Sequence, residues 1–275
     1  MNPDLGYFGP DSVTWRVHAE PVTMIGGGLR ALLLQALHPE AMALISSRSR
    51  FREEPWSRLQ RTAEYVATVS FGTTAEADAA MGRVRGVHAR FGVSDPDQLA
   101  WVHACEVDSF LAAAGYAGLS LSEQDTDRYL AEQGRVAAGV GVPDELIPTT
   151  ARDLVAFIDR MRPHLALTRP AIAAARVIMV PPLPVPPRYV VPARIGWTTA
   201  SSIAVGMLPD WARRMYRLPP LPGRRMATTV ALRSARAGMT LLPEEWQHGP
   251  HYRAARERAA LPSVQANNLP ATYLS

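Results

Sequence analysis

The stretch "TTAEADAAMGRVRGVHARFG", residues 73–92, has the spacing of an amphipathic α-helix whose start and end are both written into the sequence. Thr73 followed three residues later by Glu76 is the pattern of a capping box, which satisfies free backbone N–H groups at a helix start. Gly92 suits the left-handed position just after a helix end. Between these signals, apolar spacings of three and four residues predict one buried stripe, made of Ala77, Ala80, Met81, Val84, Val87, His88 and Phe91.

His88 is the unusual member of this stripe, because a titratable imidazole is uncommon on an apolar helix face. Burial disfavours the charged ring, so we expect a neutral imidazole with a lone pair on one nitrogen. The residue alone leaves two interpretations open. His88 is either a core histidine held by a hydrogen bond, which is the more common use of a buried histidine, or a metal ligand.

Helical spacing continues along most of the chain, and no segment has the alternation typical of a half-buried strand. Residues 181–192, "PPLPVPPRYVVP", contain too many prolines for a helix or a central strand and predict an extended crossover, with helical spacing resuming near Trp197. The fold class expected is all-α: one helical domain over residues 10–245 and a C-terminal tail over 246–275, poorly ordered from Pro262 onward. The expected helices cover 21–37, a segment through 45, 55–70, 73–92, 95–115, 122–140, 150–161, 169–180, 197–207 and 226–239.

Composition narrows the class of protein. All 29 basic residues are arginine, and the two parts of the chain differ in charge: residues 1–150 carry 12 Arg against 19 Asp and Glu, and residues 151–275 carry 17 against 6. A basic half suits nucleic acid, an anionic membrane surface or an anionic ligand. No nucleic-acid partner is expected, because no RNA-binding signature or dense arginine run with aromatics occurs. Peripheral membrane contact through the basic half stays open, as does the oligomeric state.

The single cysteine, Cys105, excludes an internal disulfide, a covalent haem attachment of the Cys-x-x-Cys-His type and a cysteine-rich metal site. No apolar run is long enough to span a membrane, and the first residues have neither the basic nor the apolar region of a secretory signal. We therefore expect a cytoplasmic protein.

Two further histidines lie on apolar helix faces. His103 shares a face with Glu106 at i+3, but a single His-x-x-Glu is a weak metal signal, because helical di-iron sites repeat the motif and add carboxylates. His38 follows "LLLQAL", where a charged ring could instead cap the negative end of the helix dipole.

Arg58, Arg61 and Thr62 form a polar cluster on the helix expected over 55–70, within about a third of its circumference. The two arginines are either solvated or, together with the hydroxyl, face an anionic cofactor or bound dioxygen. Spacing alone does not choose between these.

Four segments in order, "LLLQALHPEA" (32–41), "RLQRTAEYVATVSFGTTAEA" (58–77), "RVRGVHARFG" (83–92) and "WVHACEVDSFL" (101–111), resemble the rubber-oxygenase family. This family includes the latex-clearing proteins and the membrane-bound oxygenase of mycophenolic acid biosynthesis, and the resemblance covers roughly residues 10–245. It implies a helical fold with a globin-like core and non-covalently bound haem b.

The resemblance also implies site residues. His88 is expected to be the proximal iron ligand, and Arg58, Arg61 and Thr62 match the family's distal Arg-x-x-(Lys/Arg)-Thr stretch. His38 and His103 match positions common in the wider family. Two departures argue against rubber as the substrate. The latex-clearing proteins have a lysine at the position of Arg61, which can ligate iron where an arginine cannot, and a histidine at the position of Val93.

The function expected is therefore that of a b-type haem-dependent oxygenase acting with dioxygen on an apolar organic small molecule, with Arg61 and Thr62 donating hydrogen bonds to the oxygen species. Two alternatives stay open from the residues. One is a non-haem metal oxidoreductase using His38, His88, His103 and Glu106. The other is a helical carrier or sensor that binds haem or an apolar molecule without turnover.

Overall fold

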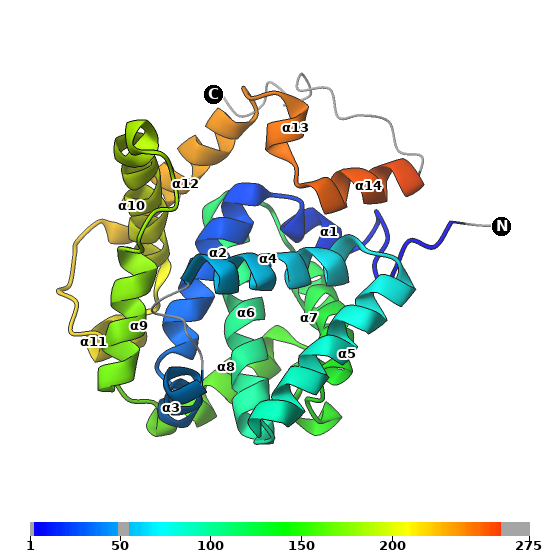
Figure 1. Cartoon of the computed structure of the whole chain (residues 1–275), viewed down its shortest axis with the longest axis horizontal. Helices are drawn as coiled ribbons and strands as arrows, with labels where there is room; N and C mark the ends of the chain where they lie inside the picture. Colours follow the sequence, from blue (N-terminus) through cyan, green and yellow to red (C-terminus); the bar gives the residue numbers. More distant parts are fainter. Residues whose placement is uncertain (1–2, 49–54, 260–275) are drawn as a thin grey trace.

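The protein is an assembly of helices. The computed structural model describes residues 3–48 and 55–259, and within these ranges no β-strand occurs, which confirms the all-α prediction (Figure 1). The helices at positions expected from the sequence are α2 (Pro21–Gln35), α3 (Pro39–Arg48), α4 (Pro55–Phe71), α5 (Thr74–Phe91), α6 (Pro96–Tyr116), α7 (Glu123–Gly139), α8 (Ala151–Met161), α9 (Arg169–Met179), α10 (Val190–Met207) and α12 (Arg224–Met239). Further short helices are α1 (Val13–His18), α11 (Asp210–Met215), α13 (Glu244–Gln247) and α14 (Pro250–Arg258), with single turns η1 (Asp144–Leu146), η2 (Arg162–His164) and η3 (Pro187–Tyr189).

The ends of α5 follow the local signals in the sequence. The Thr73 hydroxyl accepts from the Glu76 backbone N–H, and the Glu76 carboxylate accepts from the Thr73 N–H at 2.8 Å, so the capping box is complete. Gly92 ends the helix at φ 66°, a conformation that glycine adopts without steric cost. Both predicted ends of α5 are confirmed.

The proline-rich crossover is shorter than expected. Residues 181–186 contain no helix, but η3 follows and α10 begins at Val190 rather than near Trp197. Pro192 therefore lies in the first turn of α10, where its missing N–H is no loss because the first-turn N–H groups have no partner within the helix. The prediction was right for the first half of the segment and wrong for the second.

Helices α2 and α6 pack against each other in the centre of the molecule, with α7 and α8 also against α6 (Figure 1). Gly27 of α2 lies directly on α6, so the two backbones approach closely. Arg30 fixes the same contact from a buried position: its guanidinium donates to Ser109 at 2.7 Å, pairs with Asp108 at 2.8 Å, and reaches the Met207 carbonyl of α10 at 3.0 Å. This charged anchor, hydrogen-bonded on several sides, fixes α2 relative to α6 and α10.

Part of the expected C-terminal tail, residues 246–275, is folded. Helix α14 packs against α4, and Ala255 is fully buried there. The Tyr252 ring lies edge-on to Trp15 and Phe71, with centroids 5.7 and 5.2 Å apart. The end of the tail, from residue 260, lies outside the described residues. Among the described helices, none combines the length and the apolar character needed to cross a bilayer.

Candidate functional site

The stripe predicted on α5 is buried only in its first half. Ala77, Ala80 and Met81 are buried, whereas Val87 is 51% exposed. α5 packs against α4 and α7, and it runs obliquely across the molecule from the end of α4 to the start of α6 (Figure 1). Helical periodicity placed Ala77, Ala80 and Met81 on the buried side correctly and placed Val87 there wrongly.

His88 lies in this C-terminal half and is half-buried. Burial lowers the pKa of its imidazole below the ordinary value, so the ring is neutral at neutral pH. Its Nδ1 is buried and has no hydrogen-bond partner among the described residues. A core histidine held through Nδ1 would have such a partner, and its absence leaves a neutral ring with a nitrogen that the described protein does not use.

A second neutral histidine lies on α6. His103 is buried, burial lowers its pKa to about 4, and its Nε2 has no partner among the described residues. One turn further on, burial raises the pKa of the Glu106 carboxyl to about 7. The Glu106 charge, after burial, is also a cause of the raised pKa of Tyr65 on α4. Burial thus disfavours the charged forms of His103, Glu106 and Tyr65 alike.

The His38 side chain caps the start of a helix, not the helix end that its place after "LLLQAL" suggested. Its ring is buried, and Nδ1 accepts the Ala41 backbone N–H at 3.3 Å, so it caps the start of α3 instead of the end of the preceding helix. An accepting nitrogen must be unprotonated, which agrees with the lowering of the His38 pKa by burial. The charged cap predicted from the sequence was wrong, because Pro39 starts a new helix immediately and its free N–H groups need acceptors.

The four side chains proposed for a non-haem metal site do not assemble as one. Within residues 3–48 and 55–259, no group of three or more His, Cys, Asp or Glu side chains is arranged to hold a metal ion. The alternative that uses His38, His88, His103 and Glu106 together therefore lacks its ligand geometry in the described part of the chain.

The polar cluster on α4 is divided by the structure. Arg58 and Thr62 line an apolar cavity, and burial followed by the Arg61 charge lowers the Arg58 pKa without discharging it. Arg61 is exposed, does not line this cavity, and donates to the Ser57 hydroxyl at 3.3 Å. The Thr62 hydroxyl donates to the Arg58 carbonyl at 3.1 Å, so as arranged it offers lone pairs rather than a hydrogen.

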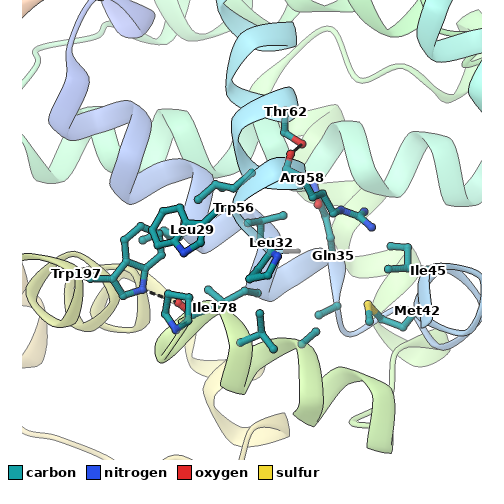
Figure 2. Close-up of a pocket in the computed structure, with 16 residues that line it drawn as sticks. Leu29, Leu32, Gln35, Met42, Ile45, Trp56, Arg58, Thr62, Ile178 and Trp197 are labelled. Carbon is teal, nitrogen blue, oxygen red and sulfur yellow. Dashed lines mark hydrogen bonds between the residues drawn. The ribbon is translucent and has the colours of Figure 1, made fainter. Parts of the chain in front are cut away.

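The cavity has a volume of about 100 Å³ and lies between α2, α3, α4, α9 and α10 (Figure 2). Figure 2 shows Arg58 and Thr62 on successive turns of α4, with Trp56 and Trp197 side by side at one end. The two indoles meet edge to face with centroids 4.8 Å apart, and Trp197 Nε1 donates to the Ile178 carbonyl at 2.9 Å. The other walls are mainly aliphatic, including Leu29, Leu32, Met42, Ile45 and Val177. Such a space suits an apolar ligand with one polar end.

Sequence reasoning missed the aromatic end of this cavity and also a buried hydrogen-bond network beside α6. In this network, His18 lies between Ser70 Oγ at 2.6 Å and Tyr129 OH at 2.9 Å, and Ser70 donates to the Val66 carbonyl. Because the Ser70 hydrogen is used on Val66, Ser70 accepts from His18 Nδ1–H and Tyr129 donates to Nε2. A neutral His18 is thus fully satisfied. No local motif signals this network, because its members come from three distant helices.

A comparison with families of known proteins identifies the fold around this cavity. The sequence model described as "ER-bound oxygenase mpaB/B'/Rubber oxygenase, catalytic domain" matches residues 15–239. The chain belongs to this family. The match runs from α1 to the end of α12 and thus includes α4, α5 and α6, and it confirms the family suggested by the four sequence segments. No curated protein and no solved structure matched the chain. The globin-like core implied by the resemblance therefore stays a prediction, whereas oxygenase chemistry, and with it an oxidoreductase, is shown by the family.

Proposed function

We propose that this oxygenase depends on haem b, with His88 as the iron ligand, and uses dioxygen to oxidise an apolar organic small molecule. The observation that carries the proposal is the state of His88: a neutral ring whose buried Nδ1 has no partner, at the position that the family resemblance expects for the ligand. Non-covalent binding agrees with the single cysteine, which is buried on α6.

The residues present fit such a group. A haem ligand must be an unprotonated imidazole, and the lowered pKa of His88 keeps the ring in that form. Burial disfavours the charged forms of His103 and Glu106 on α6 and of Tyr65 on α4, which agrees with a mostly apolar cofactor near these side chains. Haem, when bound, supplies the redox-active iron that dioxygen chemistry needs.

The chain's own residues bind and orient the substrate. Apolar walls and the Trp56–Trp197 pair offer an apolar molecule a binding surface against α4. Arg58 places a permanent positive charge at the wall of this space, where a low dielectric strengthens its effect on any negative charge that develops on oxygen. The Glu106 carboxyl, with a pKa of about 7, holds a proton about half of the time at neutral pH. A distal role for Arg61 rests on the sequence match alone.

The test compares matched histidine variants. The wild-type protein reconstituted with haemin should show a Soret band, His88→Gly should lose it, and His103→Ala and His38→Ala should keep most of it. Circular dichroism verifies that each variant is helical, and added imidazole should restore the band in His88→Gly by filling the space of the missing ring. A His88→Gly protein with an unchanged Soret band and ligation would show that another residue is the ligand.

Turnover is tested separately from binding. Arg58→Ala and Arg61→Ala should both keep their haem, and substrate-dependent oxygen consumption should fall in each variant if both arginines are distal residues. If substrate-dependent oxygen consumption falls in Arg58→Ala alone, the distal site is restricted to the cavity wall. Haem binding without substrate-dependent oxygen consumption across a panel of apolar substrates would instead indicate a carrier or sensor.

A further inference from the structure

The segment between α9 and the first turns of α10 exposes several large apolar side chains. Val180 is 67% exposed, Val191 68% and Ile195 63%, and the Tyr189 ring is half exposed. These residues come from a stretch of 16 residues, 180–195, that also contains the exposed prolines of the crossover. Exposed apolar side chains gathered in one segment mark an interaction site, whereas the same residues scattered singly would not.

The charge around this segment has one sign. Between Asp159 and Asp210 the sequence has no Asp or Glu and has six arginines. Arg176 on α9 and Arg188 in η3 are exposed, and no carboxylate of the described residues pairs with either. The Arg188 guanidinium lies 4.8 Å from the centroid of the neighbouring Tyr189 ring. The segment thus combines apolar side chains, an aromatic ring and unneutralised positive charge.

The same segment forms one rim of the apolar cavity. Pro181 and Trp197 both line the cavity, and the Trp56 indole N–H donates to the Pro182 carbonyl. Arg194 is tied back to this rim by a hydrogen bond to the Pro181 carbonyl at 3.0 Å. α9 and α10, which flank the segment, pack against each other and form one edge of the molecule in Figure 1. A surface in contact with residues 180–195 would therefore lie next to the cavity.

We propose that residues 180–195 dock this protein onto an anionic lipid membrane, and that an apolar substrate enters the cavity from the bilayer across this rim. The second half of the proposal rests on the proposed function. Aliphatic side chains enter the interface, tyrosine is favoured at the headgroup level, and arginines attract anionic lipids, so each component has a place on a membrane surface. A second copy of the chain is a poorer occupant, because pairing this face with itself would bring the unpaired arginines together.

The experiment is flotation of the full-length protein with two kinds of vesicle, phosphatidylcholine alone and equal parts of phosphatidylcholine and phosphatidylglycerol. The wild-type protein should bind the anionic vesicles and not the zwitterionic ones, with binding that weakens as salt rises. The double variant Val191→Asp/Ile195→Asp should bind at least about tenfold more weakly, because two apolar side chains no longer enter the interface.

The matched control is Val155→Asp/Val230→Asp, whose valines on α8 and α12 are each 59% exposed and whose charge change is identical. It should bind as the wild type does. The proposal would be overturned if both double variants lost vesicle binding equally, or if the wild-type protein did not float with the vesicles. A wild-type dimer that Val191→Asp/Ile195→Asp converts to a monomer, without any vesicle binding, would assign the face to self-association and also overturn it. Flotation is independent of haem and turnover, so its failure would leave the proposed function untouched.

Discussion

The three consecutive glycines of α2 have different surroundings, and alanine at each should change stability differently. A Cβ at Gly27 would lie 2.7 Å from Phe110 Cδ1, 3.1 Å from the Ser109 carbonyl oxygen and 3.3 Å from Phe110 Cα. Two of these neighbours are α6 backbone atoms, which cannot move without shifting a helix. At Gly28, a Cβ would meet nothing within 4 Å. The contact distance for carbon atoms is about 3.5–4.0 Å, so only Gly27→Ala forces α2 and α6 apart.

The magnitudes follow from two opposing effects. Alanine in place of glycine inside a helix stabilises by about 0.5–1 kcal/mol, which Gly28→Ala should gain in full. Overpacking costs typically about 1–3 kcal/mol, so Gly27→Ala should lose about 1–2 kcal/mol net. With about 2–4 °C of Tm per kcal/mol for a chain of this size, the two variants should melt several degrees apart.

Thermal unfolding followed by far-UV circular dichroism measures this difference. Gly26→Ala is an internal reference, because the nearest atom to its Cβ would be the flexible Met207 Cε at 3.2 Å, and its effect should fall between the other two. If Gly27→Ala were as stable as Gly28→Ala, the close approach of α2 to α6 would be wrong. The cavity walls that α2 contributes, Leu29 and Leu32, would then be misplaced as well.

Two further predictions concern the buried network and the cavity. Burial lowers the pKa of His18 to about 3 from an unfolded value of 6.5. Below pH 6.5 the unfolded chain therefore binds more protons at this residue than the folded chain does. The free energy of unfolding should be highest above pH 6.5 and should fall by about 2 kcal/mol by pH 5 on account of His18. Urea unfolding over this pH range should therefore show a flatter slope for His18→Gln than for the wild type, and equal slopes would refute the assignment. Ala174 lines the cavity and its neighbour Ala173 does not, so Ala174→Phe should abolish binding of an apolar fluorescent probe and Ala173→Phe should not. Equal probe binding by these two variants would show that the probe binds elsewhere.

The helices were predictable from the sequence because the signals that start and end them are local. The Thr73–Glu76 capping box and Gly92 bound α5 as expected. The start of α10 was missed because the prolines before it were interpreted as excluding a helix, although Pro192 is tolerated in a first turn. Short helices such as α14 lack enough periodicity to stand out, and they form because a neighbour buries one side, as α4 buries Ala255.

The candidate site was predictable only in part, because periodicity fixes the direction of a side chain and not what lies opposite. Arg58 and Thr62, at i and i+4, share a face as expected. Arg61 was grouped with them by angle, yet it does not line the cavity, and its side chain donates to the Ser57 hydroxyl. The Trp56–Trp197 contact joins residues from opposite halves of the chain, and no pattern within either helix indicates it. The cavity is therefore a property of the tertiary fold.

The buried histidines differ more in the hydrogen bonds of their ring nitrogens than in the burial of their side chains. His18 and His38 are as buried as His103, but His18 uses both ring nitrogens and His38 gives Nδ1 to a backbone N–H. Among the histidines that the structure describes, only His88 and His103 keep a buried ring nitrogen without a partner. Since a buried polar atom left unpaired costs about 1–3 kcal/mol, a ligand on either nitrogen would remove such a cost. His88 is the half-buried one of the two, which agrees with the proposal that His88, rather than His103, holds the cofactor.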